Sequence, residues 1–365
     1  MKDRFETFNS SRVIFFIMIF ICCVLIGAVF KIASIVILPF TIAVLLAFVM
    51  YPIVRWLDKF RIPRFISILL IVLIITAGLS VFGMVLFTSG RNIFSLYIKY
   101  ERRINDIYIW VAHLLELSYD ESLTIWQNLW NQLGIRTWVY NFTFSFSNIF
   151  FQFLTSAVLV VIFVVFILLE ATYFKEKLEV AFDKHSDRIH QMGHDLMSQV
   201  TRYLTAKFYI SVANGVIFAV AFHLIGLEFA IFWGILQFIL NFIPNLGSIT
   251  CGLVVSLFAL IQFWPEPGPV VMVVSVVLLV NLVLGYTMDP KIIGEHVGIS
   301  PLIVLTSLAI WGYIWGFAGM IIAVPMTVII RILCENIDFL EPISILVGTR
   351  KSVLAKKAEK EKAEN

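Results

Sequence analysis

Long apolar runs separated by short polar connections dominate the chain from residue 13 onward. Six of these runs reach about 18 residues or more, near the length that a helix needs to cross a bilayer; they lie at about 13 to 30, 35 to 54, 65 to 87, 149 to 170, 208 to 226 and 270 to 288. Spans of this kind must be helical, because hydrocarbon offers no partner to an unpaired backbone group. The pattern predicts an all-α polytopic membrane protein with about six full transmembrane spans.

Two further apolar stretches are broken in the middle. The first, between Glu228 and Trp264, is interrupted by Pro244, Asn245 and Gly247, which leaves two arms of about 15 residues, short of a full span. The second runs from Pro301 to about Leu333. It is interrupted by glycines and leaves arms of about 14 to 17 residues, with Gly312, Gly316 and Gly319 at the break. We expect both stretches to form helical hairpins, which gives about eight predicted segments in all.

One span followed by one hairpin occurs twice, at 208 to 264 and at 270 to 333. The first hairpin is expected to enter from outside and the second from inside, so the two units have opposite topology. Inverted repeats with interrupted helices build the midplane substrate sites of many secondary transporters. We therefore expect the hairpin tips to take part in substrate binding or gating.

Basic residues predict the topology. One short loop contains four basic residues, Arg55, Lys59, Arg61 and Arg64. The positive-inside rule places this loop in the cytoplasm. The short connection after Lys31 predicts that the first two spans form an antiparallel pair, so the N-terminus is cytoplasmic too, and the basic C-terminus falls on the same side. The predicted regions are 1–90 with three spans, 91–148 outside, 149–207 with a span and a cytoplasmic charged helix, 208–333 as the transport core, and 334–365 as a basic cytoplasmic tail.

The outer region begins with apolar residues at three-four spacing, from Ile93 to Leu114, which predicts an amphipathic helix. Such a helix either covers the protein's own outer surface or contacts the membrane interface or another subunit.

Composition agrees with a membrane protein. The chain has 365 residues, of which 60% are hydrophobic and 14% charged, whereas soluble domains are about 25% charged. The net charge of +3 gives no reason to expect a nucleic-acid partner. The four cysteines and six histidines form no metal-ligand or catalytic pattern, so we expect no enzyme activity, no metal and no cofactor.

The polar residues expected at membrane depth are neutral. Gln237 and Asn241 share a helix face, and Asn245 lies at the first hairpin tip. Amides of this kind suit a small polar, hydroxylated solute. Glu228 and Asp289 lie at opposite hairpin bases, where they are either proton or ion carriers or charges that cap the helices at the interface.

Three segments resemble the autoinducer-2 exporter family, also called PerM-like permeases. They are PFTIAVLLAFVMYPIVRWL (39 to 57), NFIPNLGSI (241 to 249) and DPKIIGEHVGISPLIVLTSLAIWGYIWGFAGMIIAVP (289 to 325). The resemblance implies a bacterial inner-membrane homo-oligomer. It also implies export of the furanone signal autoinducer-2, as in some members, or exchange of sodium or another monovalent cation for protons, as in others. The family's hairpin motifs carry over onto Pro244 and Gly247, and onto Gly312, Gly316, Gly319 and Pro325. This chain departs from the first motif at Asn245.

Three functions follow as hypotheses. The first is export of a small polar solute, with an autoinducer-2-like signal as the expected cargo, and the second is monovalent cation/proton antiport. The missing mid-depth carboxylate favours the first. The third hypothesis is an oligomeric membrane scaffold without transport, which would leave the broken helices unexplained.

Overall fold

Helices make up almost all of the structure. The computed structural model describes residues 10–114, 151–171, 173, 177, 186–288, 298–336 and 340–349. Seven helices in these ranges are long and apolar enough to cross a membrane, so the predicted all-α polytopic fold is confirmed. In chain order the helices are α1 (Ser10–Ile32), α2 (Ser34–Lys59), α3 (Arg64–Leu114), Phe151–Ala171, α6 (Ser186–Ile225), α7 (Ala230–Leu240), α8 (Leu246–Phe263), α9 (Pro267–Val280), η2 (Asn281–Met288), α11 (Pro301–Glu335) and α12 (Glu341–Val347).

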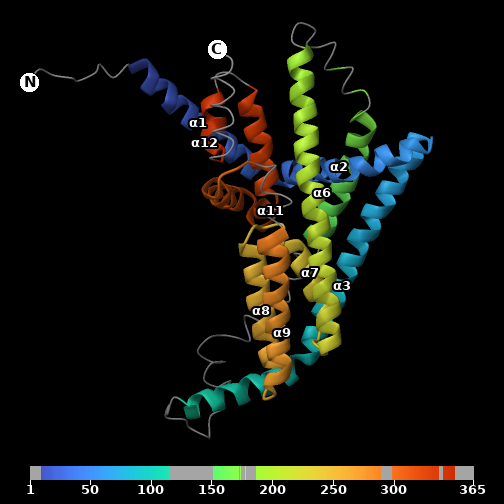
Figure 1. Ribbon diagram of the computed structural model, residues 1–365, viewed down its shortest axis with the longest axis vertical. Helices are drawn as coiled ribbons and strands as arrows, with labels where there is room; N and C mark the ends of the chain where they lie inside the picture. The colour runs from blue at the N-terminus through green and yellow to red at the C-terminus, as the bar shows by residue number, and fades with distance from the viewer. Residues whose placement is uncertain are drawn as a thin grey trace, which may run out of the picture.

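The predicted antiparallel pairing of the first two spans is wrong. Only Ala33 interrupts the helix between α1 and α2, and the backbone hydrogen bonds Ala33 N to Val29 O and Ile37 N to Ala33 O bridge the break. A reversal needs about 2–5 connecting residues, so one residue can only bend the chain. Figure 1 shows α1 continuing into α2, which crosses the upper part of the molecule.

Two helices run through boundaries that the sequence pattern suggested. The helix α3 is continuous over 51 residues, and its last part, predicted as an amphipathic helix outside the membrane, crosses the lower ends of α8 and α9 in Figure 1. There it packs on the protein's own surface, with the Tyr100 ring against Phe258 and Trp110 against Trp264. The helix α6 is continuous over 40 residues and joins the predicted charged helix to the fifth span. The boundaries at 90/91 and 207/208 therefore fall inside helices, while residues 115–148 lie outside the described part of the chain.

The first predicted hairpin is confirmed, with unequal arms. Its arms are α7, with 11 residues, and α8, with 18, and residues 241–245 form the turn. The arms of about 15 residues each were wrong, because the turn begins before Pro244 and takes residues 241–243 from the first arm. At the base, the Gln262 side chain joins the arms: its Oε1 accepts from Glu228 N and its Nε2 donates to Gly226 O.

The second predicted hairpin lies within α11. Trp315 and Gly316 leave the helical conformation and divide the stretch in two. Ser307 Oγ of the first arm donates to Ala323 O of the second at 3.0 Å and pairs with Thr327 Oγ1, so the arms lie side by side. A hydrogen bond from Trp315 Nε1 to Phe30 O ties this tip to the end of α1.

The helix α6 is the common neighbour of the two hairpins. Its second half packs with the first hairpin and α9 around Phe218 and Phe222, and its first half packs with α11 around Val200 and Leu204. The backbones of α6 and α7 approach each other closely. A Cβ at Gly215 would lie 2.8 Å from the Gly234 carbonyl oxygen, and a Cβ at Gly234 only 2.5 Å from the Gly215 carbonyl oxygen.

The predicted basic tail begins later than residue 334. The helix α11 continues to Glu335, and α12 packs against it. The chain then pairs with the start of α11, because Ser300 N donates to Val347 O and Thr349 N to Gly298 O. Residues 350–365 lie outside the described part of the chain.

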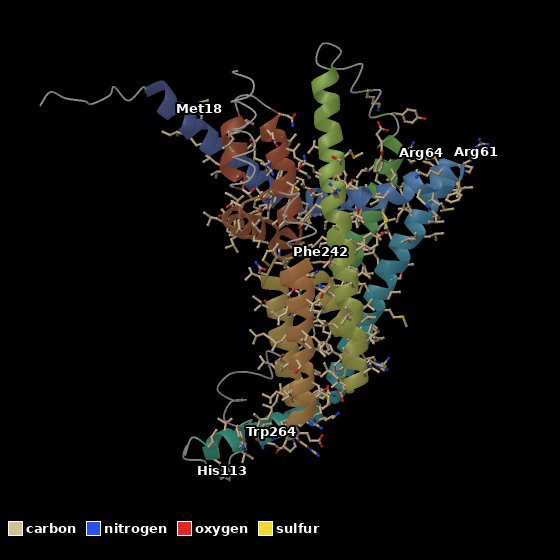
Figure 2. The ribbon with its side chains drawn as sticks, viewed as in Figure 1. Met18, Arg61, Arg64, His113, Phe242 and Trp264 are labelled. Atoms are coloured by element: carbon tan, nitrogen blue, oxygen red, sulfur yellow. The ribbon has the colours of Figure 1, made fainter. Side chains whose placement is uncertain are left out.

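The arrangement predicts which loops share a side of the membrane. Figure 2 places Arg61 and Arg64 toward one end of the molecule and His113 and Trp264 at the other. In intact cells, a thiol reagent that cannot cross the membrane should label cysteines placed at His113 and Glu266 but not at Arg61. Labelling of Arg61→Cys from outside, in a variant with the native cysteines removed, would contradict this orientation.

Candidate functional site

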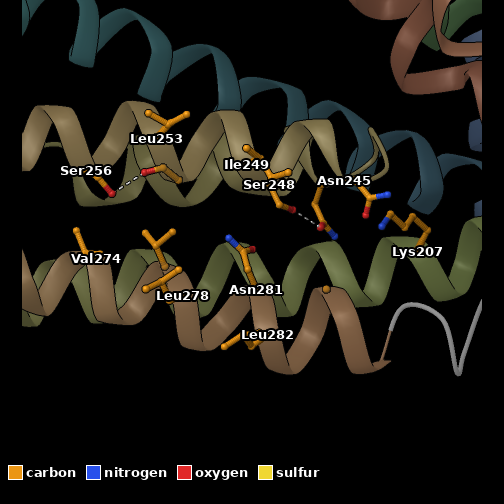
Figure 3. Close-up of a pocket in the computed structure, with 14 residues that line it drawn as sticks. Lys207, Asn245, Ser248, Ile249, Leu253, Ser256, Val274, Leu278, Asn281 and Leu282 are labelled. Carbon is orange, nitrogen blue, oxygen red and sulfur yellow. Dashed lines mark hydrogen bonds between the residues drawn. The ribbon is translucent and has the colours of Figure 1, made fainter. Parts of the chain in front are cut away.

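A cavity of about 400 Å³ lies between α8 and α9, below the tip of the first hairpin. The two helices contribute facing side chains at the three-four spacing of a helix face, as Figure 3 shows. The lining residues are Asn245, Ser248, Ile249, Gly252, Leu253 and Ser256 along α8; Val274, Val277, Leu278, Asn281, Leu282 and Gly285 along α9 and η2; and Lys207 and Asn241. The walls are mainly apolar, with polar groups concentrated toward the hairpin tip.

Asn245 and Asn281 present carboxamides to this cavity from opposite walls. Asn245 is the N-cap of α8 and adopts φ 59° and ψ −52°, and its side chain makes no capping hydrogen bond. Asn281 begins η2, a π-helical continuation of α9. Short π-helical segments are rare and often occur at functional sites. Neither carboxamide has a side-chain hydrogen bond within the described ranges, so both are available to a solute.

Asn241, predicted as a substrate-binding residue, lines the cavity and also binds neighbouring side chains. It is only 2% exposed, and its Nδ2 donates to Ser211 Oγ of α6 at 3.0 Å, while its Oδ1 accepts from Ser248 Oγ at 3.2 Å. Gln237, which is fully buried, donates from Nε2 to the same Ser248 hydroxyl at 3.4 Å and does not line the cavity. These two amides hold the hairpin arms and α6 together, Asn241 at the cavity wall and Gln237 behind it.

Lys207 is a lining residue that the sequence analysis missed. It was assigned to the end of the cytoplasmic charged segment, but it lies within the apolar span Leu196–Ile225 and is 2% exposed. In Figure 3 its side chain extends beside Asn245. A signal was present in the sequence, because apolar residues continue on both sides of Lys207 and a lysine within such a segment is a candidate functional residue.

The second hairpin's motif residues lie away from this cavity. Gly312, Gly316, Gly319 and Pro325 all belong to α11, and none lines the cavity. Gly316 has φ 61° and ψ −141°, a conformation for which a side chain is strongly unfavourable, so it makes the turn. A Cβ at Gly319 would lie 2.0 Å from the carbonyl oxygen of Trp311, so the arms could not pack.

The first hairpin uses the same kind of contact. A Cβ at Gly247 would lie 1.7 Å from the carbonyl oxygen of Leu240. Pro244 lies in the turn itself, where it has no amide hydrogen to leave unpaired. These two residues shape the tip, and Asn245 between them faces the cavity.

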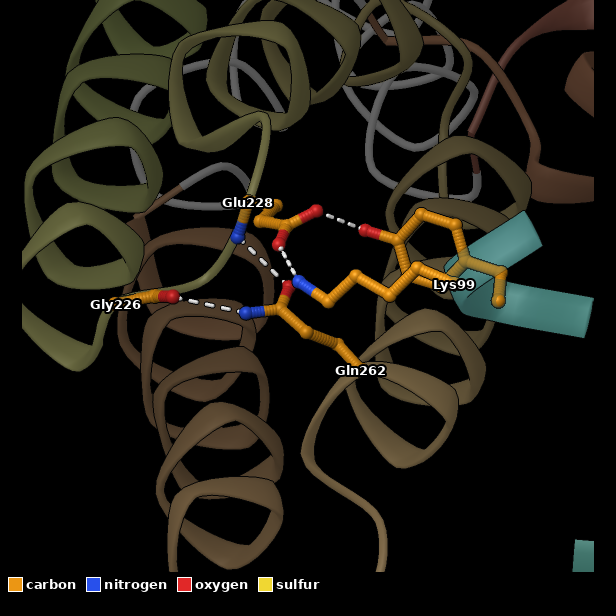
Figure 4. A network of polar contacts seen from close by, with 5 residues as sticks. Lys99, Gly226, Glu228 and Gln262 are labelled. Carbon is orange, nitrogen blue, oxygen red and sulfur yellow. Dashed lines mark hydrogen bonds and ion pairs between the residues drawn. The ribbon is translucent and has the colours of Figure 1, made fainter. Parts of the chain in front are cut away.

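Glu228 belongs to a separate polar network at the base of the first hairpin (Figure 4). Its carboxylate accepts from Lys99 Nζ at 2.5 Å and from the Tyr100 hydroxyl. Partial burial by itself raises the pKa of Glu228, but the hydrogen bonds from Lys99 and Tyr100 and the charges of Lys99 and Arg103 outweigh this effect, so the pKa is lowered. Burial, and then the bond to Glu228, raises the pKa of Tyr100, so the phenol stays protonated and donates.

The network is remote from the cavity tip. Gln262, which contacts Glu228, is 17 residues along α8 from Asn245, or about 25 Å at the rise of an α-helix. Asp289, the other carboxylate predicted as an ion carrier, lies outside the described residues. The described residues also include no group of three or more His, Cys, Asp or Glu that could hold a metal ion.

The chain was compared with known protein families and with individual proteins, and the matches are to transporters. The model of the AI-2E family transporter matches residues 14–338. A Borreliella burgdorferi protein is 29% identical over 334 residues, which cover 91% of this chain and 90% of that protein. The AI-2 transport protein TqsA of Escherichia coli K12 is 26% identical over 321 residues, covering 87% of this chain and 91% of TqsA. The E. coli K12 protein YhhT is 27% identical over 319 residues, which cover 87% of this chain and 89% of YhhT.

The glycine contacts in α11 predict that alanine lowers the stability of the protein more at position 319 than at position 312. Gly319→Ala should lower the melting temperature of the detergent-solubilised protein by an amount that corresponds to about 1–3 kcal/mol, because its Cβ meets a backbone oxygen. Gly312→Ala is the matched control. Its Cβ meets only the flexible Met320 side chain, at 3.0 Å, so its effect should stay below about 1 kcal/mol. Equal effects of the two variants would contradict this account of the hairpin.

The Glu228 network predicts a pH dependence. Because its folded pKa is lowered, Glu228 stabilises the fold at pH values above its unfolded pKa, and this stabilisation is lost as the pH falls through the folded pKa. Glu228→Gln should therefore be less stable than the wild type by roughly 1 kcal/mol at pH 7. The difference should disappear once the pH is below the folded pKa, as thermal unfolding at pH 7 and at a series of decreasing acidic pH values would measure. A difference that persists in acid would show that the carboxylate charge is not what holds the network.

Proposed function

Because the chain belongs to the AI-2E family of transporters, we propose that this multi-pass membrane protein moves a small polar solute through the cavity between α8 and α9. The observation that carries the proposal is the pair of carboxamides, Asn245 and Asn281, which face a mainly apolar cavity from opposite walls. We further propose that the cargo is an autoinducer-2-like signal and that the direction is export. The similarity to TqsA, an AI-2 transport protein, supports this choice of cargo.

The local geometry suits reversible binding of a hydroxylated solute. Amide groups donate to and accept from hydroxyl and carbonyl groups without a fixed charge, and mainly apolar walls exclude competing water. The cavity volume of about 400 Å³ is in the lower part of the range for small-molecule sites, which restricts the cargo to small solutes.

Cation/proton antiport remains the second hypothesis, and the described carboxylates do not favour it. Glu228 is already bound by Lys99 and Tyr100 at the base of the hairpin, on a different part of the molecule from the cavity. An ion carrier would have to exchange these partners for the cation in every cycle. Glu228 is better explained as the residue that fastens the end of α3 to the first hairpin.

We place the protein in a bacterial inner membrane with the α2–α3 turn and the C-terminus in the cytoplasm. The basic cluster around Arg61 and Arg64 supports this orientation. Homo-oligomerisation is part of the same proposal, which here rests on the resemblance to the family.

Replacement of the cavity amides tests the function. In proteoliposomes, Asn281→Leu and Asn245→Gly should each reduce the flux of labelled autoinducer-2 by about 10- to 100-fold, equivalent to roughly 1–3 kcal/mol for the lost hydrogen bonds. Glycine is chosen at position 245 because it keeps the positive φ without strain. Glu228→Gln, which changes a carboxylate outside the cavity, should leave the flux within about two-fold of wild type.

Proton movement in the same vesicles separates the two hypotheses. If a sodium gradient drives proton movement in the wild type, and Glu228→Gln or Asp289→Asn abolishes it while no labelled solute crosses, the antiport hypothesis replaces the proposed function. Solute flux that depends on Asn281 supports the proposed function, whatever ion provides the driving force.

A further inference from the structure

Polar and apolar groups are separated along the length of the cavity. Figure 3 shows Asn245 and Asn281 toward the hairpin tip, and Leu253 and Val274 toward the other end. From Asn245 to Ser256, 11 residues along α8 correspond to about 16 Å at the rise of an α-helix. The cavity is therefore elongated, with its carboxamides in the half nearer the tip.

A close contact between α8 and α9 marks where the polar part ends. A Cβ on Gly252 would lie 2.6 Å from Val277 Cγ1 and 3.7 Å from Asn281 Nδ2, so Asn281 lies level with Gly252. The Ser256 hydroxyl, farther from the tip, already donates to Gly252 O at 2.7 Å. From the level of Gly252 away from the tip, the lining residues are Leu253, Ser256, Val274, Val277 and Leu278. This part of the cavity is therefore apolar.

The cavity opens along its side at the depth of the membrane. Four large apolar side chains that line it are also 50–58% exposed: Ile249 and Leu253 of α8, and Leu278 and Leu282 of α9 and η2. Both walls belong to helices that are long and apolar enough to cross a membrane, so this opening faces hydrocarbon. A solute in the cavity can therefore place an alkyl chain between the two helices without exposing the chain to water.

We propose that the cavity prefers small single-chain amphiphiles, bound with a hydroxylated head between Asn245 and Asn281 and an alkyl chain in the apolar part. That part measures about 6 Å along α8, from Gly252 to Ser256. At about 1.2 Å for each bond of an extended chain, about six carbons span this distance. A volume of about 400 Å³ suits such a solute and does not hold a two-chain phospholipid. The inference rests on the proposed transport function and extends its cargo beyond an autoinducer-2-like signal to solutes with an apolar chain.

Two diols with the same head group test the chain directly. 1,2-Propanediol and 1,2-octanediol differ only in five methylene groups, and each methylene that leaves water strengthens binding by up to about four-fold. With the protein in lipid nanodiscs, equilibrium dialysis of the radiolabelled diols, corrected for empty nanodiscs of the same lipid, should show octanediol bound saturably and ten-fold or more tightly than propanediol. Equal binding of the two diols, or no binding of octanediol, would overturn the proposal. A cavity already filled by a lipid chain gives equal binding and is rejected by the same result.

Neighbouring leucines assign the preference to the cavity. Leu278 lines the cavity and Leu279 does not, although their side chains are similarly exposed, at 57% and 61%. Leu278→Asn should reduce the preference for octanediol by about five-fold or more, because an amide then meets the alkyl chain. Leu279→Asn, the matched control, should leave the preference unchanged. If Leu278→Asn fails to fold, Leu253→Asn on the facing wall, with Leu257→Asn as its control, provides the same comparison. Equal effects within the pair that folds would show that the chain binds elsewhere and would overturn the proposal.

Asn281→Leu tests where the head binds. It should weaken binding of both diols by about ten-fold, because both lose the same hydrogen bonds, while the preference for octanediol remains. Unchanged binding of octanediol in this variant would overturn the proposed orientation of the solute. Failure here is distinguishable from failure of the proposed function. Flux of labelled autoinducer-2 that needs Asn281, together with equal binding of the two diols, would preserve transport and reject only the preference for amphiphiles.

Discussion

The close backbone contact between α6 and α7 is the interaction on which the transport core depends. Gly215 and Gly234 bring the two backbones so near that a methyl group on either would strike the other's carbonyl oxygen. At this separation Asn241 reaches Ser211, which fixes the tip of the first hairpin on α6. In a membrane, where lipid competes equally for apolar surface, close packing of this kind is a main source of helix association.

The arms of the two hairpins pack together through the same kind of backbone contact. In each, a glycine near the start of the second arm lies against a carbonyl oxygen in the last turn of the first arm: Gly247 against Leu240, and Gly319 against Trp311. The turns differ, since the first uses five residues around Pro244 and the second only Trp315 and Gly316. A shared contact with different turns agrees with the predicted repeat of a span followed by a hairpin. It also explains why little sequence identity is needed for the two units to resemble each other.

The hairpins and the tip residue Asn245 could be predicted because proline and glycine mark local breaks in an otherwise periodic pattern. The bend at Ala33 could not, since a helix that merely changes direction needs no breaking residue. Lys207 was missed for a different reason: its position in the cavity depends on how α6 packs, which is a long-range property, and a charged residue near a predicted boundary is ordinarily assigned to the loop. The hydrogen bond of Asn241 could not be predicted either, because its partner Ser211 belongs to α6 and lies beside it only in the packed structure.

The backbone conformation of Asn245 restricts how the cavity can change its chemistry. At a φ of 59° and a ψ of −52°, outside the left-handed helical region, a residue with a side chain is strained and glycine is not. The asparagine at this tip is therefore held at a conformational cost that the packing of the hairpin has to offset. Because the same residue lines the cavity, the chemistry of the cavity and the stability of the turn depend on one position. A substitution there changes both at once, whereas Asn281 on the opposite wall can change the cavity alone.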